Sequence, residues 1–232
     1  MSDSDSTYWA HSSRILTSDS GSRVGWQPLA VHLEAVATLA GELAEFARPG
    51  DKRFATLAGL SGLLDDYGKY TQCFQQMLRT GRGHCQHSIH GALLSYFGAS
   101  GENFKPNLTH VAAAIVGHHA GLPDFTGDGN SLASRLRDER YRKEAQELLK
   151  NATQDSAGLH RAIETELPQV RLTREQPEAA RLDLYPRMLA SCLVRSRLYT
   201  HSGYDSQHRS PAGEDRPRTT QRDDGQLAKQ QQ

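Results

Sequence analysis

Apolar residues recur at helical spacing along most of this chain, and this periodicity constrains the fold more than any other feature. After Trp26, Gln27 and Pro28, apolar side chains follow at intervals of three or four residues up to Pro49-Gly50: Leu29, Leu33, Val36, Leu39, Leu43 and Phe46. This spacing predicts an amphipathic helix, and a proline suits its first turn. The stretch THVAAAIVGHHAG, which Thr109 can cap, is apolar nearly all round and predicts a buried helix.

The same pattern predicts further helices: residues 52–66, a helix carrying Phe74, Met77 and Leu78, a helix from His87 to Phe97, a long charged helix starting at Ser131, and helices over 157–167 and 178–198. Strands of alternating pattern do not cluster anywhere. We therefore predict an all-α fold with one domain over residues 8–200. Residues 1–7 and 201–232 are polar and predict disordered ends, because they offer too little apolar surface to offset chain entropy.

Composition limits the partners and the cellular compartment that we expect for the protein. The 27 basic and 27 acidic residues cancel, so any nucleic-acid binding has to be local. The three cysteines, Cys73, Cys85 and Cys192, show no metal-type spacing, and there is no signal peptide or long apolar run. We expect a cytoplasmic protein with reduced thiols and no membrane partner.

Histidine is the one unusual component, with 11 residues. Several histidines and two adjacent aspartates fall at the inner face or the end of predicted buried helices: His32, Asp65, Asp66, His87, His118 and His119. Imidazole and carboxylate are ligands that suit manganese, iron, cobalt, nickel or zinc, and a carboxylate can bridge two ions. Such a pair of ions can activate water and hold a phosphodiester oxygen. The helices are therefore predicted to converge on a metal centre that hydrolyses phosphate esters.

Each of these residues also has a structural interpretation. His32 could be a hydrogen-bonded core histidine, and Asp65-Asp66 could be a solvated helix end, although carboxylates there oppose the helix dipole. Two imidazoles that close an apolar helix, His118 and His119, are harder to explain without partners. Lys69 could be a surface lysine or could face a substrate phosphate. His84, His90 and His110 are interpreted as structural or exposed.

Six segments, taken in order, carry a family resemblance: YWAHS (8–12), WQPLAVHLEAV (26–36), GLLDDYGKYTQCFQ (62–75), HSIHGA (87–92), IVGHHAGLPD (115–124) and RMLASCLV (187–194). Together they resemble the HD-type nuclease domain of the type I CRISPR nuclease-helicase, a domain that some systems encode as a separate chain. The resemblance implies an HD-domain helical bundle with one or two divalent transition metal ions (Mn, Fe, Ni or Co) between its helices.

The resemblance also implies roles and partners. By motif match, His32 is the ligand from the first helix, Asp66 is the bridging aspartate, and His87, His118 and His119 bind the second ion. Lys69 matches a lysine near the scissile phosphate, and together with Asp66 it is the implied catalytic residue. The implied activity is endonuclease and exonuclease cleavage of single-stranded DNA in antiviral defence. The implied partners are an RNA-guided surveillance complex and a helicase. Because this sequence lacks a phosphate-binding loop, the helicase is expected to be a separate chain or to have been lost downstream.

Two positions depart from the family pattern. Asp65 replaces the histidine of the HD pair, an oxygen ligand that would favour harder ions such as manganese. After SCLV the family has an acidic-Ala-Asp sequence that completes a metal site, whereas this chain has Arg195, Ser196 and Arg197. Arginine cannot ligate a cation and would repel it.

A shift of reading frame would explain the second departure. Arg-Ser-Arg-Leu can be encoded CGA AGC CGA CTT, whose next frame reads Glu-Ala-Asp, so residues from Arg195 onward are hypothesised to be out of frame. Sequencing the encoding DNA tests this. Two alternative functions stay open: a nucleotide phosphohydrolase with the same ligand chemistry, and a degenerate, non-catalytic HD module, which Arg195 and Arg197 favour.

Overall fold

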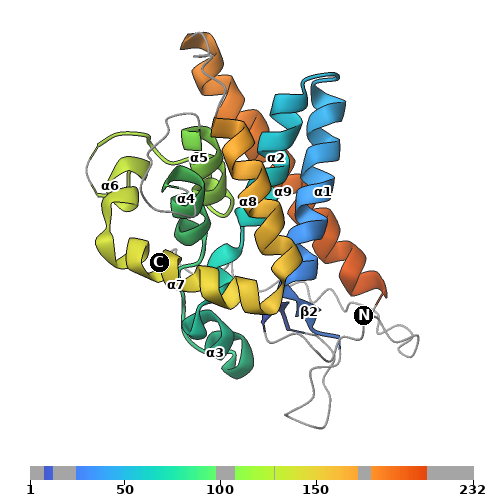
Figure 1. Cartoon of the computed structure of the whole chain (residues 1–232), viewed down its shortest axis with the longest axis vertical. Helices are drawn as coiled ribbons and strands as arrows, with labels where there is room; N and C mark the ends of the chain where they lie inside the picture. Colours follow the sequence, from blue (N-terminus) through green and yellow to red (C-terminus); the bar gives the residue numbers. More distant parts are fainter. Residues whose placement is uncertain (1–7, 13–24, 98–107, 128, 172–178, 208–232) are drawn as a thin grey trace, which may run out of the picture.

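The computed structural model describes residues 8–12, 25–97, 108–127, 129–171 and 179–207. In these ranges the chain is a bundle of α-helices with one short two-stranded ribbon (Figure 1), which confirms the all-α prediction. The helices are α1 (Leu29–Ala47), α2 (Lys52–Leu64), α3 (Gln72–Thr80), α4 (Ser88–Phe97), α5 (Thr109–Gly117), α6 (Leu132–Arg137), α7 (Glu139–Asp155), α8 (Ala157–Arg171) and α9 (Ala179–Gln207), with a 3₁₀ helix, η1 (Tyr67–Tyr70), between α2 and α3.

Helices α1 and α2 run side by side as a hairpin, and α9 packs against both (Figure 1). The buried face of α1 carries the predicted stripe, including Leu29, Leu33 and Val36. Asp51 begins α2 by accepting a hydrogen bond from the backbone N–H of Phe54 at 3.0 Å. The hairpin thus delivers the end of α2, and the two aspartates that follow it, into the interior of the bundle.

The other side of the interior is formed by α4 and α5, which pack together, with α9 against α5 and α7 against α4. Two glycines allow the backbones to approach closely here. A side chain at Gly91 in α4 would collide with the carbonyl oxygen of Leu64, and one at Gly68 would collide with the backbone of His87. Because these positions lack a Cβ atom, the start of α4 can lie directly against the end of α2.

A short antiparallel ribbon, β1 (Trp9–His11) with β2 (Gln27–Pro28), lies beside the start of α1. The buried Gln75 amide ties β1 to the bundle, since it accepts from the N–H of Trp9 at 3.1 Å and donates to its carbonyl at 3.0 Å. The sequence did not predict this ribbon, because strands of two and three residues are too short to show an alternating pattern.

Several helix boundaries differ from expectation, among them the ends of the helices expected over 52–66 and 157–167, which lie at Leu64 and Arg171. The first helix begins at Leu29 rather than in the Trp26–Pro28 stretch, because Gln27 and Pro28 pair with β1. The charged helix expected from Ser131 is two helices, because Asp138 leaves helical geometry and caps α7 by accepting from the N–H of Arg140. The last helix continues to Gln207, past the expected domain end at 200. Residues 1–7 and 208–232, where disorder was predicted, lie outside the described residues.

Among the residues that the structure describes, no helix is both long and apolar enough to span a bilayer.

Candidate metal centre

Asp66 lies at the centre of a buried cluster of charged and imidazole side chains. It lies between α2 and η1, and its side chain is fully buried. Burial alone would raise the pKa of its carboxyl group, but Lys69, Arg197 and His32 outweigh burial and hold the pKa well below its usual value. Asp66 is therefore an ionised carboxylate whose negative charge is balanced by the positive charges around it.

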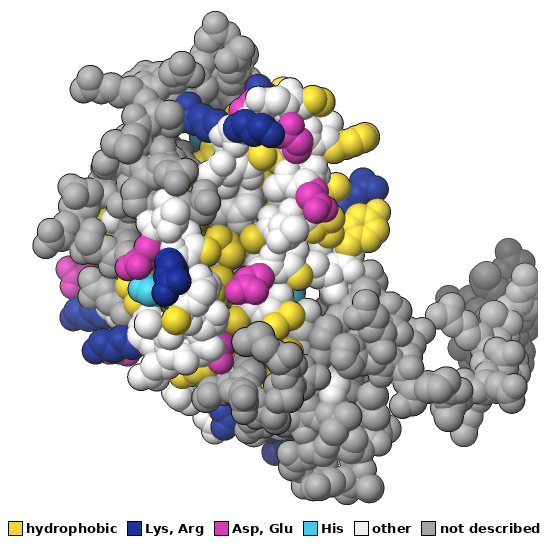
Figure 2. Space-filling model, turned by 45° about the vertical axis from the view of Figure 1, so that its right-hand side comes forward, with side chains coloured by type: hydrophobic (Ala, Val, Ile, Leu, Met, Phe, Trp, Pro, Cys, Tyr) yellow, Lys and Arg dark blue, Asp and Glu magenta, His cyan; other side chains and the backbone are white. Residues whose placement is uncertain are grey.

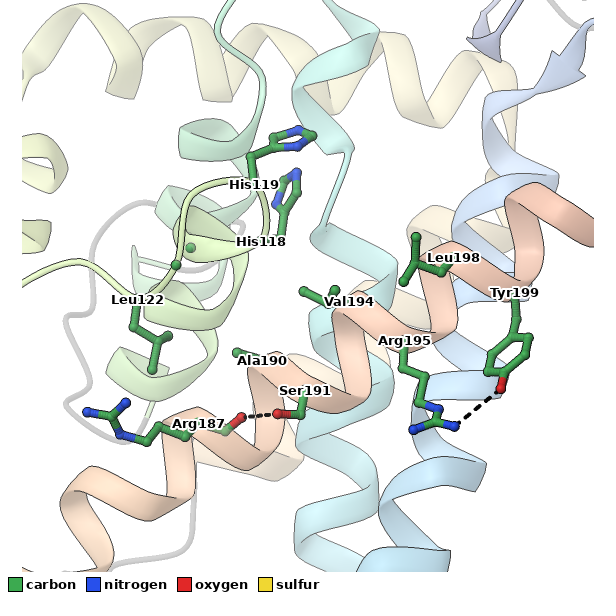
Figure 3. Close-up of a pocket in the computed structure, with 12 residues that line it drawn as sticks. His118, His119, Leu122, Arg187, Ala190, Ser191, Val194, Arg195, Leu198 and Tyr199 are labelled. Atoms are coloured by element: carbon green, nitrogen blue, oxygen red, sulfur yellow. Dashed lines mark hydrogen bonds between the residues drawn. The ribbon is translucent and has the colours of Figure 1, made fainter. Parts of the chain in front are cut away.

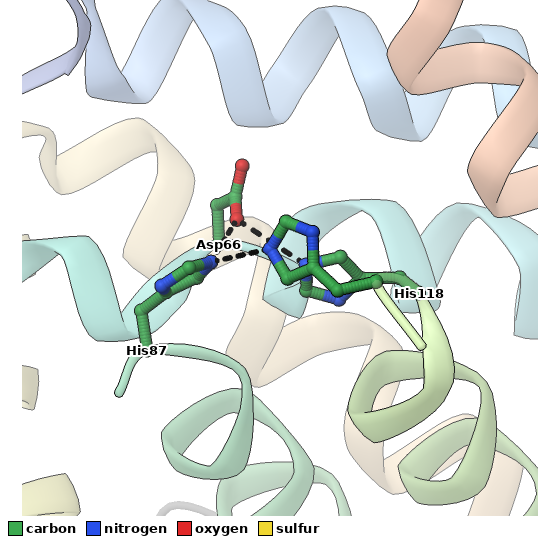
Figure 4. Close-up of side chains that lie close together, drawn as sticks. Asp66, His87 and His118 are labelled. Atoms are coloured by element: carbon green, nitrogen blue, oxygen red, sulfur yellow. Dashed lines mark hydrogen bonds and ion pairs between the residues drawn. The ribbon is translucent and has the colours of Figure 1, made fainter. Parts of the chain in front are cut away.

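Two histidines approach the Oδ1 atom of Asp66. Nε2 of His87 lies 3.4 Å from this oxygen, and Nε2 of His118 lies 3.8 Å from it. His87 immediately precedes α4 and His118 immediately follows α5, so the ends of α2, α4 and α5 converge on one point (Figure 4).

The other ring nitrogens of these histidines are held by the backbone. Nδ1 of His118 lies 2.6 Å from the carbonyl oxygen of Ile115, and Nδ1 of His87 lies 3.4 Å from that of Cys85. Since a carbonyl only accepts, each Nδ1 must carry a proton, and in the neutral ring this leaves a lone pair on Nε2. Metal-ligating histidines are usually oriented by such a second hydrogen bond. The Nε2 atom of His118 is buried and has no hydrogen-bond partner, as expected for a ligand atom.

His119 completes this group from the exposed side. Its Nε2 lies 2.8 Å from Nε2 of His87, and one ligand atom from each of Asp66, His87, His118 and His119 falls within 4.8 Å of all the others. Nitrogen ligands about 2.1 Å from one ion lie roughly 3 to 4 Å apart. The four residues therefore fit a single divalent ion with small movements.

For three of the imidazoles, the surroundings favour the neutral form that ligates metals. Burial lowers the pKa values of His32 and His87. Although His119 is exposed to solvent on one side, partial desolvation of its ring lowers its pKa to about 4, with further contributions from His118, Arg197 and His87. Protons therefore compete weakly with a metal ion at neutral pH.

A second donor group shares Asp66 and comprises His11, His32 and Asp66. Nε2 of His32 lies 3.1 Å from Oδ2 of Asp66, and its ring packs edge to face against that of His11, with 5.0 Å between centroids. His11 was missed as a candidate ligand, although it lies in the YWAHS segment. The available signal was a histidine in a matched motif, but its proximity depends on the ribbon that brings β1 to α1.

Two basic side chains contact the Asp66 carboxylate, each with its shorter contact to Oδ2. Nζ of Lys69 lies 2.9 Å from Oδ2 and also donates to the carbonyl oxygen of Ala10 at 3.0 Å. Nη2 of Arg197 donates to Oδ2 at 3.2 Å and to Oδ1 at 3.4 Å. Lys69 is buried, so the structure places its ammonium group on Asp66 and on β1 rather than at the molecular surface.

Asp65 belongs to neither donor group. Its Oδ1 lies 2.8 Å from Nδ1 of His118, and its Oδ2 forms an ion pair with Nε of Arg197. Both carboxylate oxygens thus face other side chains of the cluster. In this arrangement Asp65 orients a histidine and holds an arginine, whereas the sequence predicted a metal ligand.

The three histidines that were interpreted as structural or exposed lie outside the cluster. His84 is exposed, His90 is buried with its Nε2 atom 2.9 Å from Oε2 of Glu144, and His110 packs against the rings of Phe125 and Tyr185. These positions agree with the structural or exposed roles expected for them.

A disulfide bond between Cys73 and Cys85 supports the loop that carries His87. It joins α3 to this loop, and the ring of Phe74 packs against that of His87 at 5.3 Å between centroids. The expectation of three reduced thiols is therefore wrong for two of them, because folding brings Cys73 and Cys85 together across a turn. Cys192 is a free, buried thiol.

An open cavity of about 1000 Å³ adjoins the cluster. His118 and His119 line one end, and α9 supplies Arg187, Arg195 and Tyr199 among other residues (Figure 3). Arg195 extends along α9 to donate a hydrogen bond to the hydroxyl of Tyr199 at 3.3 Å (Figure 3). The face shown in Figure 2 carries basic, acidic and apolar side chains interspersed, in keeping with the balanced charge of the chain.

Compared with known proteins, the sequence matches no family model and no curated protein.

Proposed function

We propose that the chain is a metal-dependent phosphodiesterase of the HD type that cleaves single-stranded DNA in CRISPR interference. The observation that carries the hydrolytic part is the group of Asp66, His87, His118 and His119, which offers four ligand atoms to one divalent ion. The choice of DNA and of CRISPR defence rests on the ordered sequence motifs. On the same ground we propose a cytoplasmic protein that works with a separate helicase chain and an RNA-guided surveillance complex.

A divalent ion held by this group would activate water and polarise a phosphate oxygen. The residues around this group orient and hold the ligands. The backbone carbonyls of Ile115 and Cys85 orient the two imidazoles, and Lys69 holds Asp66 in place. His119 is exposed and lines the adjoining cavity, so a phosphodiester would approach from that side. In this proposal Lys69 acts through Asp66 and does not reach the phosphate.

A nuclease assay on the purified full chain tests the proposal. The substrate is end-labelled single-stranded DNA with added Mn²⁺, Co²⁺ or Ni²⁺, and cleavage should disappear with a chelator. His119→Gln, at an exposed position that should tolerate the change, should reduce cleavage about 100-fold or more by removing a ligand. His84→Gln is the matched control, because His84 is exposed, lies outside both donor groups and should leave cleavage unchanged.

Parallel assays with nucleoside mono- and triphosphates distinguish a nucleotide phosphohydrolase from a nuclease. Turnover of these nucleotides without cleavage of DNA would replace the proposed substrate. Absence of cleavage with every ion, in a sample folded by circular dichroism, would refute the proposal.

One observation favours a second candidate, a non-catalytic HD module. Arg197 lies where the resemblance requires an acidic ligand, and its guanidinium contacts both Asp65 and Asp66. A protein of this kind would bind its partner proteins without hydrolysing DNA. The same assay separates the two candidates, since the non-catalytic module predicts a folded chain that is inactive with all three ions.

A further inference from the structure

The two oxygens of the Asp66 carboxylate share Arg197 but otherwise face different partners. Oδ1 faces His87 and His118, whose rings belong to the donor group completed by His119. Oδ2 faces His32, Lys69 and Arg197, and the Nη2 atom of Arg197 also lies 3.4 Å from Oδ1. The Oδ1 side is therefore lined mainly by imidazoles that can bind a metal ion, while the Oδ2 side holds two cationic side chains at shorter distances.

Arg197 also neutralises the second aspartate. Its Nε atom pairs with Asp65 while its Nη2 atom donates to Asp66, so one guanidinium spans both carboxylates. A guanidinium stays protonated in proteins, so Arg197 carries its positive charge between these carboxylates. Lys69 and Arg197 together balance the charges of Asp65 and Asp66 without any ion.

From this arrangement we infer that Arg197 takes the place of one of two metal ions, so that the chain binds a single ion, at Asp66, His87, His118 and His119. The second donor group of His11, His32 and Asp66 is present, but an ion there would share Oδ2 with Lys69 and Arg197 and would be repelled by both. This inference rests on the metal centre of the proposed function and adds the number of ions and the residue that limits it.

Metal stoichiometry tests the inference. Metal-free full chain is titrated with MnCl₂ and with CoCl₂ by isothermal calorimetry, and metal content is measured after desalting. The wild type should bind one ion per chain. Arg197→Met and Arg197→Gln remove the internal cation, and each should bind two. The Gln variant provides a polar replacement in case the Met variant does not fold, as judged by circular dichroism.

Two controls show whether the gain of a second ion depends on the position of the arginine and on its charge. Arg195→Met alters an exposed arginine two residues away that contacts Tyr199, and it should keep one ion per chain. Arg197→Lys retains a positive charge at the position and should also keep one ion.

The outcomes separate this inference from the proposed function. Two ions on the wild type, or one ion on a folded Arg197→Met or Arg197→Gln variant, would overturn the inference and leave the phosphodiesterase proposal intact. A wild type that binds one ion and gains a second with Arg197→Met supports the inference even where no DNA is cleaved. A wild type that binds no ion overturns the inference together with the metal centre.

Discussion

The ammonium group of Lys69 and the carboxylate of Asp66 form an ion pair of 2.9 Å in which both side chains are buried. Lys69 also donates to the carbonyl of Ala10 in β1. The pair therefore joins three parts of the fold: the end of α2, the 3₁₀ helix η1 and the ribbon that carries His11. Its contribution to stability is testable apart from any catalytic role.

We expect Lys69→Met to lower the free energy of unfolding by about 3 kcal/mol, because it leaves a buried carboxylate without one of its cations. Urea denaturation at pH 7 measures this. Lys52→Met is the matched control. Lys52 is exposed and lies 3.6 Å from Glu45, so its loss should change stability by at most about 0.5 kcal/mol. If both substitutions lowered the free energy of unfolding equally, the buried Lys69–Asp66 ion pair would not be a specific source of stability.

The metal-free protein should lose stability as the pH falls from 7 to 5. Histidine in an unfolded chain has a pKa of about 6.5, whereas partial desolvation lowers the pKa of His119 to about 4 and burial lowers those of His32 and His87. Between these values the unfolded state binds more protons than the folded state, so stability rises with pH. Urea denaturation at several pH values measures the slope.

The titration of Asp66 does not affect the slope between pH 5 and 7. The folded pKa of Asp66 is depressed, so its stabilisation is fully present above about pH 4 and is lost only as the pH falls through that low pKa. His119→Gln should make the slope between pH 5 and 7 shallower, and His84→Gln should leave it unchanged. A slope unaffected by His119→Gln would show that His119 is not the group responsible.

Reduction of the Cys73–Cys85 disulfide should destabilise the protein by about 2–4 kcal/mol, because the unfolded chain is then less constrained. The measurement is urea denaturation with and without dithiothreitol. The double variant Cys73→Ser, Cys85→Ser should be insensitive to the reductant, and Cys192→Ser should remain as sensitive as the wild type. Loss of sensitivity in Cys192→Ser would be inconsistent with the observed pairing.

Gly91→Ala should destabilise the protein by about 1–3 kcal/mol, since the added Cβ collides with the carbonyl oxygen of Leu64 and forces α4 away from α2. Gly41→Ala is the control. The nearest atom to a Cβ at Gly41 lies at 3.7 Å, and alanine favours a helix by up to about 1 kcal/mol over glycine, so stability should be unchanged or increased. Thermal unfolding curves of the two variants show whether a loss of stability comes from the packing collision or from the change in helix propensity.

Much of the site was predictable because its signals are local. The apolar stripe of α1, the buried character of α5 and the histidines at its end follow from residues three or four apart, which share a helix face. The structure accordingly brings together Asp66, His87, His118 and His119 from predicted helix ends. Local signals also had limits, since the helix break at Asp138 depends on a single capping residue that helical periodicity does not reveal.

The sequence by itself determined the all-α class, most of the helices and the main candidate ligands. Only the tertiary structure decided that His11 approaches His32, that Lys69 points inward to Asp66, that Cys73 pairs with Cys85, and that Arg197 spans two aspartates more than 130 residues earlier in the chain. The physical reason is range. Helix formation depends on the spacing of residues that lie within a few positions of one another. These contacts form between segments that become neighbours only when the bundle packs. The negative charge of Asp66 then favours contact with the cationic side chains that packing brings near it.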